Sequence, residues 1–233
     1  MKLLAAGEGW PAGAAAVLSL LVCGAVEAGT VEPPFQIGGA YTVRVTSLKE
    51  ARQQSTVRQQ FDYSCGSAAL ATLLSHHYGH PVSEAEVLQS MLRGADTEDI
   101  RREGFSMLDM KHYLRSAGFE ADGFEAAVAE LEAAGLPAVA MINERGYPHF
   151  VVVKGVRRGR VLLADPASGL RAMAVADFEA LRATPILFVI GNRRQGVVFN
   201  RDDEWNAVPP APLAASSRVL LSLPGAWRSG SDF

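Results

Sequence analysis

The stretch QQFDYSCGSAALATLLSHHYG, residues 59–79, carries the strongest signal for the fold of this chain. From Cys65 to Tyr78 its apolar and small side chains recur every three or four residues, the spacing of one helix face, and Pro81 then stops the pattern. A helix that begins at Cys65 presents unpaired amides and the positive end of its dipole to the thiol, and both favour the thiolate. Because a thiolate is the attacking species, Cys65 is a candidate nucleophile as well as a candidate core residue.

The composition is that of a globular protein. The chain has 233 residues, of which 48% are hydrophobic and 20% charged, which suffices for one substantial core. Its formal net charge is −3 and no long basic stretch occurs, so we expect no nucleic acid partner. No phosphate-cradling glycine loop or dinucleotide fingerprint occurs either, so we expect no cofactor.

The first 28 residues have the features of a secretory signal peptide. An apolar run, residues 11–26, follows a weakly basic start, and Val26 and Ala28 stand at the −3 and −1 positions of a cut after Ala28. The run is shorter than the roughly 20 residues of a membrane span. We therefore expect export to the periplasm. Membrane contact is expected only if the signal stays uncleaved, an alternative that Glu8 leaves open.

Export changes the meaning of the two cysteines. Cleavage after Ala28 removes Cys23, and Val22 argues against a lipid-modified cysteine at that position. The mature chain then keeps Cys65 as its one thiol and forms no internal disulfide. An exported protein with a single cysteine either buries it or uses it, so the residues around Cys65 decide between the two.

The rest of the chain divides into helices followed by strands. Residues 29–56 are expected to be an extended lead-in with a strand at 41–45, residues 57–192 one domain, and residues 193–233 a poorly packed tail or a docking segment. Within the domain, further helices are predicted at 83–92, 106–117, 125–134 and 177–182, strands at 119–124, 138–142, 149–153, 160–164 and 186–190, and a loop at 94–104. This order indicates an α+β fold, with N-terminal helices packed on an antiparallel β-sheet.

Two of these strands carry further candidate residues. His149 begins the strand at 149–153, and Asp165 follows the strand at 160–164. If the two strands pair as a hairpin, His149 and Asp165 come to the same end of the sheet. The carboxylate can then hold one imidazole nitrogen while the other nitrogen faces Cys65.

Each candidate also has a plainer interpretation. His149 alone is compatible with a histidine at a strand edge, and Asp165-Pro166 alone with a turn. Gln59, or less favourably Gln60, can place a side-chain amide beside the Cys65 N–H and stabilise an oxyanion. The conjunction favours an active site: a glutamine, Cys-Gly at a helix start, a histidine before a valine strand, and Asp-Pro after the next strand.

Four separated motifs give the chain a resemblance to a known family. They are DYSCGSAAL at 62–70, GFSMLDM at 104–110 followed by AGF at 117–119, PHFVVV at 148–153, and Asp165-Pro166 with Gly169. In this order they resemble the peptidase C39 family, papain-like cysteine peptidases best known as leader-cleaving domains of bacteriocin-exporting ABC transporters. The resemblance covers about residues 50–192 and implies the papain-like cysteine peptidase fold.

The resemblance implies a role for each candidate residue. Cys65 is implied as the nucleophile, His149 as the base, Asp165 as the residue that orients His149, and Gln59 as an oxyanion donor. With its signal peptide, the chain resembles the peptidase component of functional-amyloid secretion systems, which implies an exported protein or peptide as substrate and contacts with other secretion-system components. Ser64 stands where transporter-linked members carry an acidic residue, so their double-glycine specificity is not implied.

Other interpretations stay open at this point. The fold could serve as a catalytically weak binding or chaperone module for secretion, or as a cell-wall amidase of another papain-like group. The upstream glutamine and the Asp-Pro pair argue against the amidase. His76, His77 and His80 resemble a metal cluster, but Gly79 and Pro81 break the helix there and no nearby carboxylate or thiol completes a ligand set, so no metal is expected.

Overall fold

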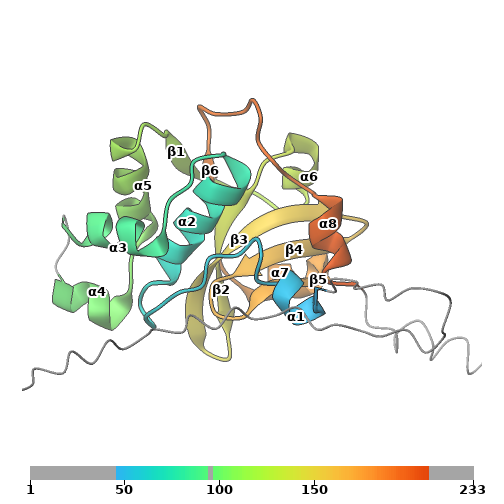
Figure 1. The fold of residues 1–233 in the computed structure, drawn as a ribbon, viewed down its shortest axis with the longest axis horizontal. Helices are drawn as coiled ribbons and strands as arrows, with labels where there is room; N and C mark the ends of the chain where they lie inside the picture. The colour runs from blue at the N-terminus through green and yellow to red at the C-terminus, as the bar shows by residue number, and fades with distance from the viewer. Residues whose placement is uncertain (1–45, 94–96, 210–233) are drawn as a thin grey trace, which may run out of the picture. The chain divides into compact units, whose positions relative to one another are not determined.

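The computed structural model describes residues 46–93 and 97–209 (Figure 1), so the expected signal peptide and the strand at 41–45 lie outside the described residues. The helices are α1 Leu48–Ala51, α2 Cys65–His77, α3 Glu84–Leu92, α4 Thr97–Glu103, α5 Met107–Ser116, α6 Glu130–Ala134, α7 Val175–Leu181 and α8 Asp202–Asn206. The strands are β1 Ala121–Glu125, β2 Ala138–Glu144, β3 Tyr147–Arg157, β4 Arg160–Asp165, β5 Gly169–Ala174 and β6 Arg182–Ile190. None of the helices in this part of the chain has the length and apolar run needed to cross a bilayer.

The described strands form one antiparallel sheet in the order β1-β6-β2-β3-β4-β5. β2, β3, β4 and β5 follow one another as a meander, with Ala138 opposite Val153 and Val152 opposite Ala164. β6 returns from later in the chain and lies between β1 and β2. The predicted α+β fold, with helices packed on an antiparallel sheet, is confirmed, as is the hairpin that carries His149 and Asp165.

Side chains alternate between the two faces of the sheet, because successive residues of a strand point to opposite sides. One face packs against α2 and α5, and α3 packs on these two helices; Figure 1 shows all three gathered beside the strands. Strand residues of this face are Val139, Phe150, Val152, Leu162, Ala164 and Phe188. The other face packs against α6 and α7. Its strand residues are Ala138, Ala140, Ile142, Val151, Val153, Val161, Leu163 and Leu187.

The helices of the first face begin where the sequence predicts. α2 starts at Cys65 and is buried along almost its whole length against β3 and α3. α3 starts at a capping box formed by Ser83 and Glu86, and α5 at a second one formed by Ser106 and Asp109. Gly66 in α2 lies close to Met110 of α5, Phe105 and Phe150, so that a Cβ at this position would require the end of the Met110 side chain to shift.

Several short elements correct the sequence predictions. The expected loop at 94–104 contains α4, a polar helix anchored by buried Ile100 and supported by ion pairs three residues apart. The expected lead-in at 29–56 contains α1, whose N-cap is Ser47. β5 was not predicted, since its sequence GLRAMA lacks the β-branched and aromatic residues typical of strands. α7 begins after Ala174, earlier than predicted from Asp177.

The C-terminal segment, which we define as residues 198–208, packs on the domain. Its Val198 exchanges two hydrogen bonds with His77 at the end of α2. Glu204 of α8 lies 2.6 Å from the Nζ of Lys154, a residue of β3 with no exposed surface. Lys154 Nζ also donates to the Ser55 carbonyl at 2.7 Å. A poorly packed tail is therefore wrong for residues 198–208.

Candidate active site

Cys65 is the first residue of α2 and follows a tight turn. Ser64 precedes it as the N-cap, but the Ser64 hydroxyl bonds to the turn rather than to the helix. The Phe61 N–H donates to Ser64 Oγ at 3.1 Å, and Ser64 Oγ lies 3.0 Å from the Phe61 carbonyl. Ser64 thus leaves the first amides of α2 without a side-chain cap, and these amides can stabilise negative charge beside Cys65.

The thiol of Cys65 is buried, with 8% of the residue exposed. Burial raises the pKa of Cys65 above its usual value, while the backbone N–H groups of Phe150, Gly66 and Cys65 itself lower the pKa only in part. Phe150 directly follows His149 in β3, so the sulfur lies beside the start of that strand. Because the net shift is upward, the thiol needs a base to become a nucleophile at neutral pH.

His149 and Asp165 come together at one end of β3 and β4. His149 Nε2 lies 3.2 Å from Asp165 Oδ2, and both residues are buried. An ionised carboxylate only accepts hydrogen bonds, so the proton of the neutral imidazole is on Nε2. The other ring nitrogen, Nδ1, can then take a proton.

Both oxygens of the Asp165 carboxylate are engaged. Oδ1 accepts from the backbone N–H groups of Ala167 at 2.9 Å and Ser168 at 3.3 Å. Oδ2 faces His149 and also lies 3.0 Å from Arg171 Nη2. Burial raises the pKa of Asp165, but the His149 hydrogen bond, the Ala167 amide and the Arg171 charge together hold it below the ordinary value. Asp165 is therefore a carboxylate at neutral pH.

Gln59 is tied to the same end of the sheet. Its backbone N–H donates to the Pro166 carbonyl at 3.1 Å, which joins the loop before α2 to the turn after β4. Its side-chain Nε2 donates to the Phe61 carbonyl at 3.1 Å, and this amide has a second N–H to offer. Gln60 is exposed and lies in a groove with Phe61 and α3.

The candidate residues are not all joined in this structure. Within the described residues, no hydrogen bond connects the Cys65 thiol with His149 or with the Gln59 amide. Hydrogen bonds of this kind are often long in a free enzyme and tighten when substrate binds.

Tyr147 is a neighbour of the site that the sequence analysis did not identify. Its hydroxyl donates to the Asp62 carbonyl at 3.1 Å, and so links the start of β3 to the loop before Cys65. Its ring lies 6.4 Å from that of His149, centroid to centroid, and is 55% exposed. Only the fold brings Tyr147 and Asp62 together, since 85 residues separate them.

Arg171 and Glu144 were also missed. Arg171 lies on β5, the unpredicted strand, and pairs with Asp165 and with Glu144 of β2. Glu144, His149 and Asp165 place ligand atoms within 4.8 Å of one another, a set that could in principle hold a metal ion. The guanidinium of Arg171 already pairs with both carboxylates, so an ion pair network accounts for their proximity.

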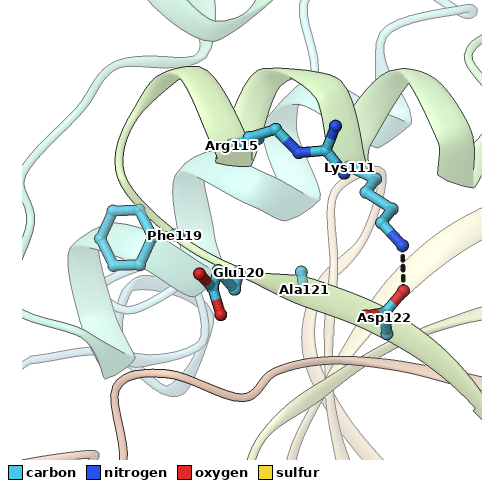
Figure 2. Close-up of a pocket in the computed structure, with 6 residues that line it drawn as sticks. All are labelled: Lys111, Arg115, Phe119, Glu120, Ala121 and Asp122. Carbon is cyan, nitrogen blue, oxygen red and sulfur yellow. Dashed lines mark hydrogen bonds and ion pairs between the residues drawn. The ribbon is translucent and has the colours of Figure 1, made fainter.

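A hollow of about 280 Å³ lies on another part of the domain, between α5 and β1 (Figure 2). Lys111 and Asp122 form an ion pair across it, and Arg115 and Glu120 add charges of both signs. None of the candidate residues lines it, and its mixed charge indicates no particular ligand.

The histidines that resemble a metal cluster in the sequence have other partners in the structure. His77 bonds through Nδ1 to the Val198 carbonyl, and the His80 ring packs against Phe119.

Comparisons with known proteins agree with this architecture. The model of the Peptidase C39 family matches residues 53–193. A protein from Pseudomonas aeruginosa named "Probable functional amyloid protease FapD" is 40% identical over 203 residues, 87% of each chain. A protein of the same name from Pseudomonas fluorescens is 37% identical over 205 residues, again 87% of each chain.

Among solved structures, the peptidase domain of Streptococcus ComA, a bifunctional ABC transporter, is similar with a TM-score of 0.50 and 21% identity. The match covers 59% of this chain and 97% of that domain, and it supports the predicted fold. The family match spans the segment that holds α2 and the β3–β4 hairpin. The chain therefore belongs to the peptidase C39 family and is a cysteine peptidase, as its motifs predicted.

Proposed function

We propose that this protein is an exported peptidase that cleaves a peptide bond in another exported protein, within a functional-amyloid or related secretion pathway. One observation carries the chemistry: the His149–Asp165 pair lies near the start of β3, beside the helix start that bears Cys65. The two relatives named as functional amyloid proteases, each aligned over 87% of both chains, support the pathway. The signal-like residues 1–28 support export to the periplasm.

The first step in the proposed mechanism is a proton transfer. Because Asp165 holds the proton on Nε2, His149 can accept the Cys65 proton on Nδ1 and become an imidazolium. The thiolate, stabilised by the amides of Phe150 and Gly66, attacks the carbonyl carbon of the substrate. Asp165 stays ionised and stabilises the imidazolium.

The tetrahedral intermediate then needs donors for its oxyanion. The N–H of Cys65 at the start of α2 and the second N–H of the Gln59 amide are the groups that we assign to it. Collapse of the intermediate breaks the C–N bond, and the leaving amine takes the proton from His149. A water molecule, deprotonated by His149, then hydrolyses the thioester and restores the Cys65 thiol.

The proposal is tested by replacing Cys65 with Ala or Ser in the parent cell and following the exported proteins by mass spectrometry. We expect an unprocessed precursor to accumulate in both variants, while His112→Ala, at an exposed position on α5, leaves processing intact. Unchanged processing with folded Cys65→Ala protein would overturn the peptidase role and favour a binding module. Stem peptides released from purified peptidoglycan by the wild type would instead indicate an amidase.

Export is tested separately. The mature protein is expected in the periplasmic fraction, with an N-terminus that begins at Gly29 after cleavage behind Ala28. Cell fractionation followed by N-terminal sequencing measures both. A chain recovered from the cytosol with residues 1–28 intact would contradict this part of the proposal.

A further inference from the structure

Arg171 and Glu144 extend the His149–Asp165 pair into a row of four charged or chargeable groups. Arg171 Nη2 lies 3.0 Å from Asp165 Oδ2, and Arg171 Nη1 lies 3.1 Å from Glu144 Oε2. The side chains of Arg171 and Glu144 are 24% and 41% exposed, while that of Asp165 is 3% exposed. This row is compact, because a Glu144 carboxylate oxygen lies within 4.8 Å of ligand atoms of both His149 and Asp165, and Glu144 is its most exposed member.

The strands make this arrangement a consequence of the fold. Arg171 pairs with Leu163 of β4, which lies two residues before Asp165 and therefore on the same face of the sheet as Asp165. Ala164 and Leu170 alternate with these residues and belong to the opposite face, which packs against α2. His149 alternates with Phe150 in the same way. The groups of the row thus come from β2, β3, β4 and β5 on one side of the sheet, where neighbouring strands bring their side chains together.

We infer that Arg171 is a positioning residue for the reaction, holding the Asp165 carboxylate in place for His149, and that Glu144 offsets the charge of Arg171. The inference rests on the roles proposed above for Cys65, His149 and Asp165. Arg171 touches neither the substrate nor Cys65 in this scheme. It acts through the carboxylate that orients the imidazole.

Burial explains why Asp165 needs Arg171. Whenever the imidazole is neutral, the Asp165 charge without Arg171 would be buried with only neutral donors around it, which is costly. The guanidinium supplies the missing positive charge and a second anchor for Oδ2, the oxygen that faces His149.

Glu144 has the complementary effect. When His149 becomes an imidazolium, Asp165 faces two cations, and an isolated arginine would disfavour the second one. The Glu144 carboxylate, 3.1 Å from Arg171, reduces this repulsion. Other chargeable groups around the pair are Cys65 from α2, Asp62 and Tyr147. The charges of Cys65 and Asp62 act on Tyr147, and the charge of Asp165 acts on Cys65.

The test uses alkylation of Cys65 by iodoacetamide across pH 5 to 10, together with kcat and KM for a peptide that the wild type cleaves. Arg171→Met is expected to slow alkylation at pH 6 and to lower kcat by about 10- to 100-fold, the range for losing one charged contact, with KM little changed. Arg171→Lys should recover part of both, because it keeps the charge but loses the two-pronged geometry. Glu144→Gln should lower kcat less than Arg171→Met does, because it leaves the Arg171–Asp165 contact in place.

Arg160→Met provides the matched control, because Arg160 is a half-buried arginine on the same β4–β5 pair that has no contact with Asp165. It should leave the alkylation profile unchanged. Circular dichroism and melting curves monitor folding, and Arg171→Gln replaces Arg171→Met if that variant unfolds. A folded Arg171 variant with the wild-type alkylation profile and kcat would overturn the inference. Alkylation needs no substrate, so this result is distinguishable from failure of the peptidase role, which the Cys65 variants report.

Discussion

His149 Nε2 lies 3.2 Å from Asp165 Oδ2, although 16 residues separate them and they lie on different strands, His149 near the start of β3 and Asp165 at the end of β4. The contact exists because β3 and β4 form an antiparallel hairpin whose register places both side chains at one end. It leaves Nδ1 as the nitrogen that can receive the Cys65 proton. The site therefore depends on a strand pairing as much as on the residues themselves.

Asp165→Asn is predicted to lower kcat/KM for a cleaved peptide by about 100-fold. Both wild-type oxygens accept hydrogen bonds, Oδ1 from the Ala167 and Ser168 amides and Oδ2 from His149 beside Arg171. An asparagine amide has only one oxygen, so its NH₂ must face donors on one side. Asp177→Asn, the same change at an exposed position of α7, is the control and should keep full activity. Equal activity of the two variants would contradict the role of Asp165.

His149→Ala is predicted to change the pH at which Cys65 reacts. Burial raises the pKa of the Cys65 thiol, so without its base the thiol should react with iodoacetamide only above about pH 8.5, the ordinary thiol value. The wild type should react rapidly at pH 6, because the proton moves to His149. The rate of carboxamidomethylation followed by intact mass measures this. Matching profiles for the two proteins would argue that no thiolate–imidazolium pair forms.

Glu204→Gln is predicted to destabilise the fold by about 3–5 kcal/mol, because it leaves the fully buried Lys154 ammonium without its counter-charge. The double variant Lys154→Met with Glu204→Leu should recover most of this loss, since it removes both buried charges. Urea unfolding followed by circular dichroism measures the free energies. The control is Asp203→Asn in the same helix, an exposed position where the change should stay within about 0.5 kcal/mol.

Stability is also predicted to fall in acid because of His77. Burial lowers the pKa of His77 to about 3, so the folded protein resists the proton that the unfolded chain accepts near pH 6.5. A histidine with a depressed folded pKa loses stability as pH falls from the unfolded value towards the folded one, with a slope of up to about 1.4 kcal/mol per pH unit. Between pH 6.5 and 3, His77→Gln should flatten this slope.

His76, whose pKa burial lowers to about 4, should contribute in the same direction, so the double variant should be flatter still. His112→Gln removes an exposed histidine and serves as the control. Unfolding free energies measured at several pH values give the slopes. A slope that is the same for wild type and for His77→Gln would show that His77 is not the group responsible.

Local sequence signals were sufficient to predict the main helices and two of the central strands. The three-and-four spacing after Cys65 predicted α2. The helices expected at 83–92 and 106–117 are α3 and α5, which begin at the Ser83–Glu86 and Ser106–Asp109 capping boxes, and the strands expected at 149–153 and 160–164 are β3 and β4. In each case, residues close in sequence determine the structure. The order of the motifs also predicted the peptidase C39 family.

The residues that surround the His149–Asp165 pair could not be predicted, because they come together only through the fold. β5 has weak strand propensity and exists because it pairs with β4, so Arg171 had no local signal as a partner of Asp165. Tyr147 meets Asp62, and Glu204 meets Lys154, across sequence separations that no periodicity records. Local patterns report backbone preference and burial, whereas a buried charge obtains its partner from strand register and chain topology.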